Sequence, residues 1–136
     1  AVRLGGGHNH RMGLYDMAML KDNHIDFAGG IAPAVAQVRQ YLKEQQKELA
    51  IEVETRNIQE VREALAAEAD RIMLDNFDIA TTKEAVALIG GRCEVESSGG
   101  ITEHTLVPFA ECGVDYISVG ALTHHIKGVD MSLKAY

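Results

Sequence analysis

The sequence predicts an α/β fold built on a largely parallel sheet. Short segments with apolar centres recur along the chain, most are followed by a stretch with helical periodicity, and polar or glycine residues stand where they end. Strand followed by helix, repeated at similar spacing, is typical of βα units whose strands lie parallel. The 136 residues, 46% of them hydrophobic, suit one packed domain and exclude a disordered chain.

The strand predictions rest on alternation and on apolar centres. Residues 51–54 alternate apolar and polar side chains, as a half-buried strand does, and residues 71–75 have an apolar centre with a polar end. Residues 93–97 alternate again, and residues 116–119 run into a glycine. Two further short apolar segments, 2–4 and 17–20, open the chain.

Helices are predicted between these segments. Pro33 suits the first turn of one of them, and Asn57 with Glu60 and Thr81 with Glu84 resemble capping boxes. The predicted helices run over 31–49, from Asn57, from Thr81 to a stop at Gly90-Gly91, and from Thr102 to near Gly113. A closed eight-unit barrel needs roughly 200 residues or more, so the chain is either a small open sheet or a piece of a barrel.

Composition excludes several classes of protein. A net charge of -7 disfavours nucleic acid as a partner, and the apolar runs are too short to cross a membrane. Cys93 and Cys112 lack metal-ligand spacing, which favours free thiols in a reducing compartment and a cytoplasmic location. No signal-peptide pattern opens the chain, although Ala1 is not a natural start and a targeting segment could precede it.

Cationic side chains follow a glycine run near the start. Three glycines at 5–7 let the backbone turn sharply and approach a ligand closely. His10, Arg11 and Lys21 come soon after them. This pattern indicates a site for carboxylate groups, against the alternative of a loop followed by solvated charges.

Acidic side chains end two of the predicted strands. The carboxyl ends of parallel strands lie on one side of a sheet, so Glu54 and Asp75 should lie close together. Two carboxylates there can hold sugar hydroxyls or a hydrated Mg²⁺. Each also has a structural alternative, since Glu54 could be a solvated strand end and Asp75 a helix cap.

Glycine loops end the two later strands. Ser98-Gly99-Gly100 and Gly120 could offer backbone N–H groups to a phosphate, or could be ordinary tight turns. Their position beside the two carboxylates favours a site. The whole arrangement predicts a site for a phosphorylated sugar next to an acidic organic partner.

The motifs that carry these residues resemble quinolinate phosphoribosyltransferase. They occur in that family's order and cover nearly the whole chain. They are Gly-Gly-Gly-x-x-His-Arg at 5–11, Leu-Lys-Asp-Asn-His at 20–24, Glu-Val-Glu at 52–54, Leu-Asp-Asn-Phe at 74–77, Glu-x-Ser-Gly-Gly-Ile-Thr at 96–102 and Asp-Tyr-Ile-Ser-Val-Gly-Ala-Leu-Thr-His at 115–124.

The resemblance implies a type II phosphoribosyltransferase of the pentosyltransferase class. Such an enzyme joins quinolinate to phosphoribosyl pyrophosphate, requires Mg²⁺, and yields nicotinate mononucleotide, pyrophosphate and carbon dioxide for NAD biosynthesis. The family's fold is an incomplete α/β barrel with an N-terminal sandwich domain, assembled as a homodimer or larger homo-oligomer. Residues 1–136 would then be the C-terminal portion of the barrel domain, with the sandwich domain absent.

The resemblance also implies a role for each residue. His10, Arg11 and Lys21 would contact quinolinate, and Glu54 and Asp75 would serve phosphoribosyl pyrophosphate and Mg²⁺. Of these residues, Lys21, Glu54 and Asp75 would be catalytic. The phosphoribosyl pyrophosphate site would also include Ser98, Gly99, Gly100 and Gly120.

One departure and three alternatives accompany the resemblance. The family's Arg-Lys-Thr segment, which supplies further basic ligands, is absent, so we expect the isolated chain to be inactive. The alternatives are a related enzyme using nicotinate, a homologue found with molybdate transport genes, and a non-catalytic phosphate-binding α/β module.

Overall fold

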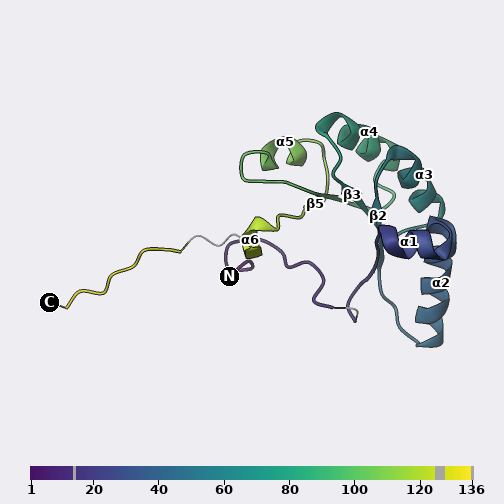
Figure 1. Ribbon diagram of the computed structural model, residues 1–136, viewed down its shortest axis with the longest axis horizontal. Coiled ribbons are helices and arrows are strands. Elements are labelled where there is room, and N and C mark those ends of the chain that lie inside the picture. The colour runs from purple at the N-terminus through teal and green to yellow at the C-terminus, as the bar shows by residue number, and fades with distance from the viewer. Residues whose placement is uncertain (14, 125–127, 136) are drawn as a thin grey trace.

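All strands of the sheet run parallel and follow one another in chain order (Figure 1). The computed structural model describes residues 1–13, 15–124 and 128–135. Its five-stranded sheet consists of β1 (Ala18–Leu20), β2 (Ile51–Thr55), β3 (Arg71–Asp75), β4 (Glu94–Ser98) and β5 (Tyr116–Ile117).

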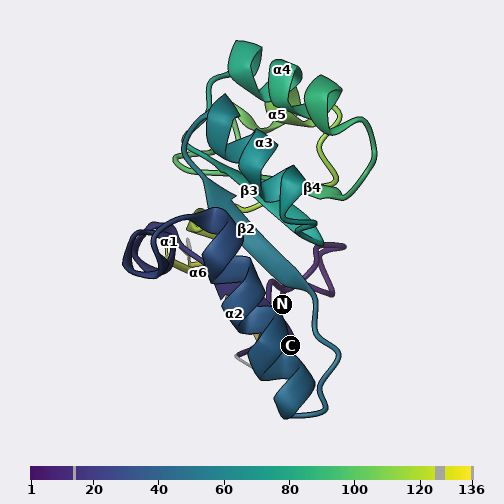
Figure 2. The ribbon, with the colours of Figure 1, turned by 90° about the vertical axis from the view of Figure 1, so that its right-hand side faces the viewer.

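Most helices cover the outer side of this sheet, while the last one lies beside the N-terminal segment on the inner side (Figures 1 and 2). The helices are α1 (Asp22–Ala28), α2 (Ile31–Glu44), α3 (Ile58–Ala66), α4 (Ile79–Ile89), α5 (Leu106–Ala110) and α6 (Ala121–His124). A doubly wound sheet would reverse its strand order part-way and carry helices on both faces. Sequential strand order with helices outside is the arrangement of a barrel segment. The α/β class and the incomplete barrel are therefore confirmed, and the small open sheet is excluded.

Strand register divides the sheet into an apolar and a polar face. Val53 lies beside Ile72, which lies beside Val95, and these side chains share one face because paired residues in a parallel sheet point the same way. They join the apolar core under the helices. Burying each such side chain contributes roughly 1.5–3 kcal/mol. The residues between them on each strand therefore point to the opposite, inner face.

Two of the helices have an N-cap residue whose side chain accepts a backbone hydrogen bond. Asn57 caps α3 by accepting a hydrogen bond from the N–H of Glu60, at 2.9 Å, as its predicted capping role requires. The Glu60 side chain reaches the N–H of Arg56 and not that of the cap residue. The predicted cap Thr81 is wrong, because Asp78 caps α4 and accepts from the N–H of Thr81 at 2.7 Å.

Other predicted boundaries also need correction. Residues 2–4 are not a strand but hydrogen-bonded turns, in which the N–H of Gly7 donates to the carbonyl of Val2. Helix α2 ends at Glu44 and not at Leu49. The helix expected from Thr102 begins only at Leu106, because residues 102–105 form a turn. None of the helices in the described ranges is long and apolar enough to cross a membrane.

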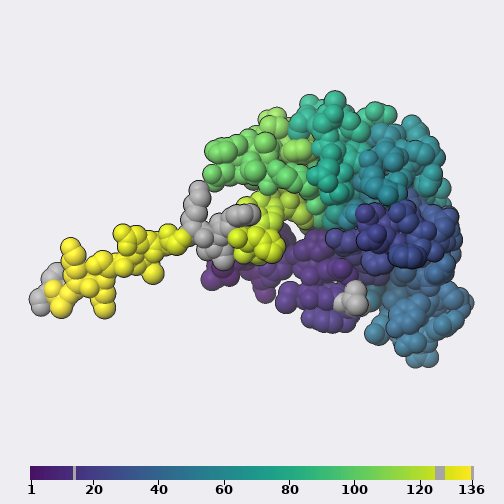
Figure 3. Space-filling model, in the orientation of Figure 1, coloured from purple at the N-terminus to yellow at the C-terminus, as the bar shows by residue number. Residues whose placement is uncertain are grey.

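The two chain ends lie on the open side of the sheet. The N-terminal segment runs along the inner face, while the C-terminal residues 128–135 extend away from the rest of the molecule (Figures 1 and 3). The inner face is therefore covered in part by the segment that carries His10 and Arg11, which places the predicted cationic residues against the polar side of the strands.

Candidate functional site

The polar side chains at the strand ends share the inner face. Asp75 pairs with Ser98, and Glu54 pairs with Met73, which lies two residues before Asp75 on the same face of β3. Lys21 directly follows β1. The expectation that Glu54 and Asp75 lie on the same face of the sheet is therefore confirmed.

A cavity of about 550 Å³ opens beside this face, at β5 and the N-terminal segment. Two predicted site residues, His10 and Gly120, line this cavity. Arg71, Glu96 and Ser118, which were not predicted, line it as well. The carboxylates at the ends of β2 and β3 are not among its lining residues. The structure thus brings the predicted residues to one face but separates them into a cavity region and a strand-end region.

Lys21 and Glu54 connect the two predicted halves of the site. The Nζ of Lys21 lies 3.8 Å from the Oε2 of Glu54, and the Lys21 side chain is 53% exposed. Burial raises the pKa of the Glu54 carboxyl and the nearby Asp75 carboxylate raises it further, while Lys21 lowers it. The negative charge of Asp75 therefore acts on the Glu54 carboxyl, as expected for two carboxylates on one face of the sheet.

His10 lies between two buried carboxylates of the inner face. Its Nε2 is 3.3 Å from the Oε2 of Glu52 and 3.3 Å from the Oε2 of Glu96. The loop after it is closed by Asp16, whose carboxylate accepts from the N–H groups of Met12 and Gly13. These hydrogen bonds lower the pKa of Asp16. The His10 imidazole itself lies against β2 and β4 through its contacts with Glu52 and Glu96.

Arg11 is half-buried next to His10. Its NH1 nitrogen is buried and has no hydrogen-bond partner among the described residues. Its positive charge lowers the pKa of Glu52, although burial and Glu96 affect that group more. A buried guanidinium nitrogen without a partner can receive an anionic ligand at little cost in competing contacts.

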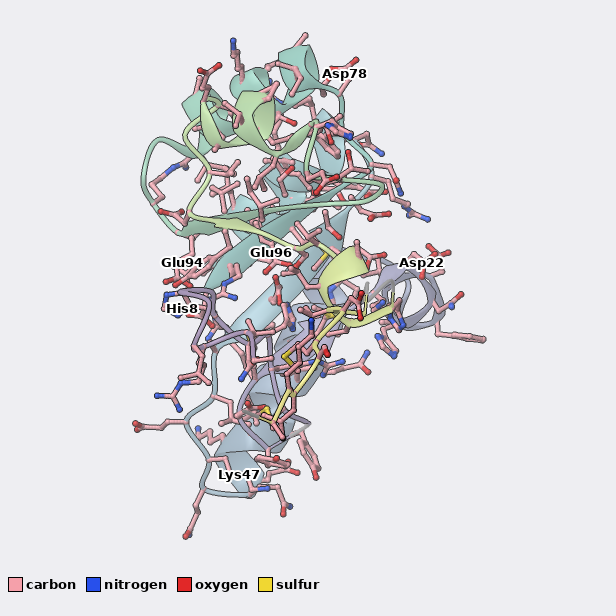
Figure 4. All side chains as sticks on the ribbon, turned by 90° about the vertical axis from the view of Figure 1, so that its left-hand side faces the viewer. His8, Asp22, Lys47, Asp78, Glu94 and Glu96 are labelled. Carbon is pink, nitrogen blue, oxygen red and sulfur yellow. The ribbon has the colours of Figure 1, made fainter. Side chains whose placement is uncertain are left out.

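Glu52 and Glu96 are acidic residues of the barrel interior. They are 0% and 1% exposed. Burial and the neighbouring Glu96 carboxylate raise the pKa of Glu52 to about 8. Arg71 offsets part of this effect: its guanidinium lies 3.6 Å from Glu96 and 2.7 Å from Glu94, over the ring of Tyr116. Figure 4 shows Glu94 and Glu96 near the N-terminal segment that carries His8.

The Ser98-Gly99-Gly100 loop packs against Asn76. The N–H of Asn76 donates to the carbonyl of Ser98 at 2.9 Å, and the Asn76 amide donates to Asp75 at 2.8 Å. Gly99 has a φ of +96°, and a Cβ placed on it would lie 2.8 Å from the backbone nitrogen of Asn76. Glycine is thus required where the two loops meet, and the contact orients the Asp75 carboxylate.

The two glycine loops lead into different local structures. Gly120 directly precedes α6, as predicted. The loop at 98–100 does not begin a helix, because α5 starts only at Leu106. Its backbone N–H groups are therefore offered by a turn with positive φ at Gly99 and Gly100 and not by a helix N-terminus.

Sequence reasoning missed the interior residues Glu52, Arg71 and Glu96, and also Asn76. The signal for the two glutamates was present, since residues two apart on a strand share a face and Glu52 stands two before Glu54. The alternation of residues 51–54 and 93–97 predicted half-buried strands and gave these glutamates no role. Only the structure shows that this face is buried beneath the N-terminal segment.

The raised pKa of Glu52 gives a pH dependence of stability. Between pH 4.5 and about 8 the folded chain holds a proton on Glu52 that the unfolded chain has lost, so the free energy of unfolding falls as pH rises through this range. We expect Glu52→Gln to make the free energy of unfolding fall less over this pH range. The difference should be on the order of a few kcal/mol, since one pKa unit corresponds to about 1.4 kcal/mol. Urea unfolding at pH 5 to 8, with a chelator present, measures it.

Glu84→Gln on the exposed surface of α4 is the matched control and should keep the fall in stability. The same pH dependence in Glu52→Gln as in the unmodified chain would show that Glu52 does not hold the proton.

Comparison with known proteins identifies the family. Residues 1–134 match the sequence profile described as quinolinate phosphoribosyl transferase, C-terminal domain. The chain belongs to the quinolinate phosphoribosyltransferase family. It is 49% identical to "Quinolinate phosphoribosyltransferase [decarboxylating] 2b, mitochondrial" of Nicotiana tabacum, over 98% of this chain and 42% of that protein.

Bacterial relatives agree with the plant protein. The chain is 46% identical to the probable nicotinate-nucleotide pyrophosphorylase [carboxylating] of Bacillus subtilis, over 98% of this chain and 45% of the relative. The solved nicotinate-nucleotide pyrophosphorylase of Francisella tularensis superposes with a TM-score of 0.90 at 46% identity, over 96% of this chain and 45% of that structure. The chain thus spans less than half the length of these quinolinate phosphoribosyltransferase relatives.

Proposed function

We propose that this chain forms part of the active site of an enzyme that transfers a phosphoribosyl group to quinolinate. The reaction releases pyrophosphate and carbon dioxide and yields nicotinate mononucleotide for NAD biosynthesis. The observation that carries the proposal is the family match over residues 1–134, combined with cationic and acidic groups on one face of the sheet. Residues 1–136 would be the C-terminal portion of the barrel domain.

The cationic residues are proposed to bind the acid. Quinolinate carries two carboxylates, and charge-assisted hydrogen bonds from His10, Arg11 and Lys21 would hold them in one orientation. The partnerless buried nitrogen of Arg11 supports this assignment. A fixed orientation places the ring nitrogen for attack on the ribose carbon, which is the main contribution that binding can make to such a transfer.

The acidic residues are proposed to serve the phosphoribosyl group. Glu54 and Asp75 lie close enough to influence each other's charge, and carboxylate oxygens suit Mg²⁺. Bound there, Mg²⁺ would supply charge neutralisation for the departing pyrophosphate. The carboxylates themselves would stabilise the positive charge that develops on the ribose in the transition state.

Lys21 has a proposed role between the two halves. It contacts Glu54 while its exposed head remains available to the acid. As pyrophosphate leaves, the pyridine nitrogen becomes bonded to the ribose carbon and positively charged. Loss of carbon dioxide then leaves an electron pair on the adjacent ring carbon, where this charge stabilises it until that carbon takes up a proton from solvent. The 5′-phosphate would be held by Ser98, Gly99, Gly100 and Gly120.

The complete enzyme is proposed to be a cytoplasmic homodimer or larger homo-oligomer. Cys93 and Cys112 are free thiols in the structure, which fits a reducing compartment, although several plant relatives are named for mitochondria or chloroplasts. Because the chain spans less than half of its relatives, we expect residues 1–136 alone to be inactive.

The proposed function is tested by product formation in a full-length protein carrying this chain. With phosphoribosyl pyrophosphate and Mg²⁺ present, we expect nicotinate mononucleotide from quinolinate at a rate at least a hundredfold above that from nicotinate. Faster turnover of nicotinate would assign the chain to the related enzyme. Binding of phosphoribosyl pyrophosphate without any turnover would indicate the non-catalytic module.

A further inference from the structure

Three potential metal ligands converge on the inner face of the sheet. They are the Nε2 of His10, on the N-terminal segment, and one carboxylate oxygen each from Glu52 on β2 and Glu96 on β4. The nitrogen lies 3.3 Å from both oxygens, and all three atoms lie within 4.8 Å of one another.

These distances match the edges of a metal coordination shell. In a tetrahedral site with metal–ligand bonds of roughly 2.0–2.1 Å, neighbouring ligand atoms are separated by about 3.3 Å. The two distances from His10 to the glutamates already have this length. An ion could therefore enter between the three atoms with only small side-chain movements.

The state of Glu52 is an independent observation in favour of a cation site. Its side chain is fully buried, and neither of its oxygens has a hydrogen-bond partner among the described residues. A buried carboxyl group without a hydrogen bond is costly, and a bound metal ion would satisfy its oxygens. Glu52 points toward the position between His10 and Glu96 that an ion would fill.

Glu96 is prepared for the same role. Its Oε1 accepts a hydrogen bond from the hydroxyl of Ser118, which leaves Oε2 facing His10. A hydrogen bond to the second oxygen of a ligating carboxylate is the usual support around metal sites. His10 and Glu96 also line the 550 Å³ cavity, so the remaining coordination positions would be open to water or a ligand.

The surrounding charges permit a divalent ion. Glu52, Glu94 and Glu96 contribute three negative charges when ionised, and Arg71 and Arg11 contribute two positive ones. Arg71 makes its shorter contacts with Glu94, at 2.7 and 3.0 Å, and lies 3.6 Å from Glu96. When all three carboxylates are ionised, the cluster has a net negative charge that favours a cation, while the two arginines limit its affinity. Metal binding therefore requires that Glu52 lose its proton.

We propose that His10, Glu52 and Glu96 form a binding site for a first-row divalent transition ion, with Zn²⁺ as its representative. An imidazole with two carboxylates favours such ions over Mg²⁺, which prefers oxygen ligands alone. The site shares no residue with the Glu54–Asp75 pair, but it includes His10, which is also a proposed quinolinate ligand. Binding through Nε2 would fix the proton of His10 on Nδ1 and make that nitrogen a hydrogen-bond donor.

The test is a Zn²⁺ titration of this chain against a chromogenic chelator, with Mg²⁺ in large excess. We expect one Zn²⁺ per chain that Mg²⁺ does not displace. Glu52→Gln and His10→Ala should each weaken its binding at least tenfold. His8→Ala, which removes an exposed histidine two residues away, is the matched control and should leave the affinity unchanged.

A second measurement does not depend on any variant. In NMR spectra of the unmodified chain, one equivalent of Zn²⁺ should shift the ring signals of His10 before those of the other histidines. Equal Zn²⁺ affinity in the unmodified chain, Glu52→Gln and His10→Ala would overturn the proposal, as would an unchanged His10 ring at saturation.

Discussion

Gly99→Ala is expected to destabilise the chain by roughly 2–4 kcal/mol, because overpacking and an unfavourable backbone angle add together. The new methyl group would lie 2.8 Å from the backbone nitrogen of Asn76, with the Asn76 side chain closer still. A backbone atom cannot turn away as a flexible side chain can. The φ of +96° adds strain for any residue with a Cβ. Urea unfolding of the two proteins measures the loss.

Gly100→Ala is the matched control for this prediction. Gly100 also has a positive φ, of +60°, but an added Cβ would meet no atom within 4 Å. We expect a loss of only about 1 kcal/mol there, from backbone strain alone. Equal losses at both positions would mean that the contact between Gly99 and Asn76 does not constrain this turn.

Arg11→Ala and Lys21→Ala are expected to weaken quinolinate binding at least tenfold in the full-length enzyme, and to change phosphoribosyl pyrophosphate binding much less. Truncating one partner of a buried charge pair costs about 2–5 kcal/mol of binding free energy. We expect only a tenfold loss of affinity as the minimum, because the Lys21 side chain is half exposed and solvent weakens its contacts. Calorimetric titration with each substrate separately measures both effects.

Glu54→Gln should show the opposite pattern and weaken phosphoribosyl pyrophosphate binding in the presence of Mg²⁺. Because Lys21 contacts Glu54, Arg11→Ala is the cleaner test of the acid side. A similar loss of both substrates in Arg11→Ala and Glu54→Gln would count against the division of the site into an acid half and a phosphoribosyl half.

The fold could be predicted because strand and helix patterns are local. Residues 51–54 and 71–75 show the alternation or apolar centre of strands, and the structure places β2 and β3 there. Asn57 was identifiable as a helix cap because the glutamate of its box stands three residues later. The choice between an open sheet and a barrel segment could not be made locally, since it depends on strand order and on which face the helices cover.

Helix starts were mispredicted where two caps compete. Asp78 and Thr81 are both residue types that cap helices, and only the observed hydrogen bond from the N–H of Thr81 to Asp78 decides between them. Asp78 is the cap, and Thr81 lies in the first turn of α4. At Thr102 the sequence favours a helix start, but the N–H of Thr102 bonds instead to the hydroxyl of Thr105, and that turn delays α5. Each outcome depends on local geometry that the residue types leave open.

The site was predictable at the strand ends and not in the interior. Glu54 and Asp75 are identifiable because a carboxylate at the end of an apolar strand stands out in the sequence. Glu52 and Glu96 have the same periodicity as solvated residues, and their burial results from the path of the N-terminal segment over the inner face. That path is a tertiary contact between segments far apart in the chain, which no local pattern records.

The most direct test of the proposed function supplies the full-length enzyme with phosphoribosyl pyrophosphate and with quinolinate labelled in its 2-carboxylate. The measured quantity is the ratio of labelled carbon dioxide to pyrophosphate released. We expect one labelled carbon dioxide for each pyrophosphate, and no release of either when quinolinate or phosphoribosyl pyrophosphate is omitted. Pyrophosphate release without labelled carbon dioxide, or carbon dioxide release that does not require phosphoribosyl pyrophosphate, would contradict the proposed transfer with decarboxylation.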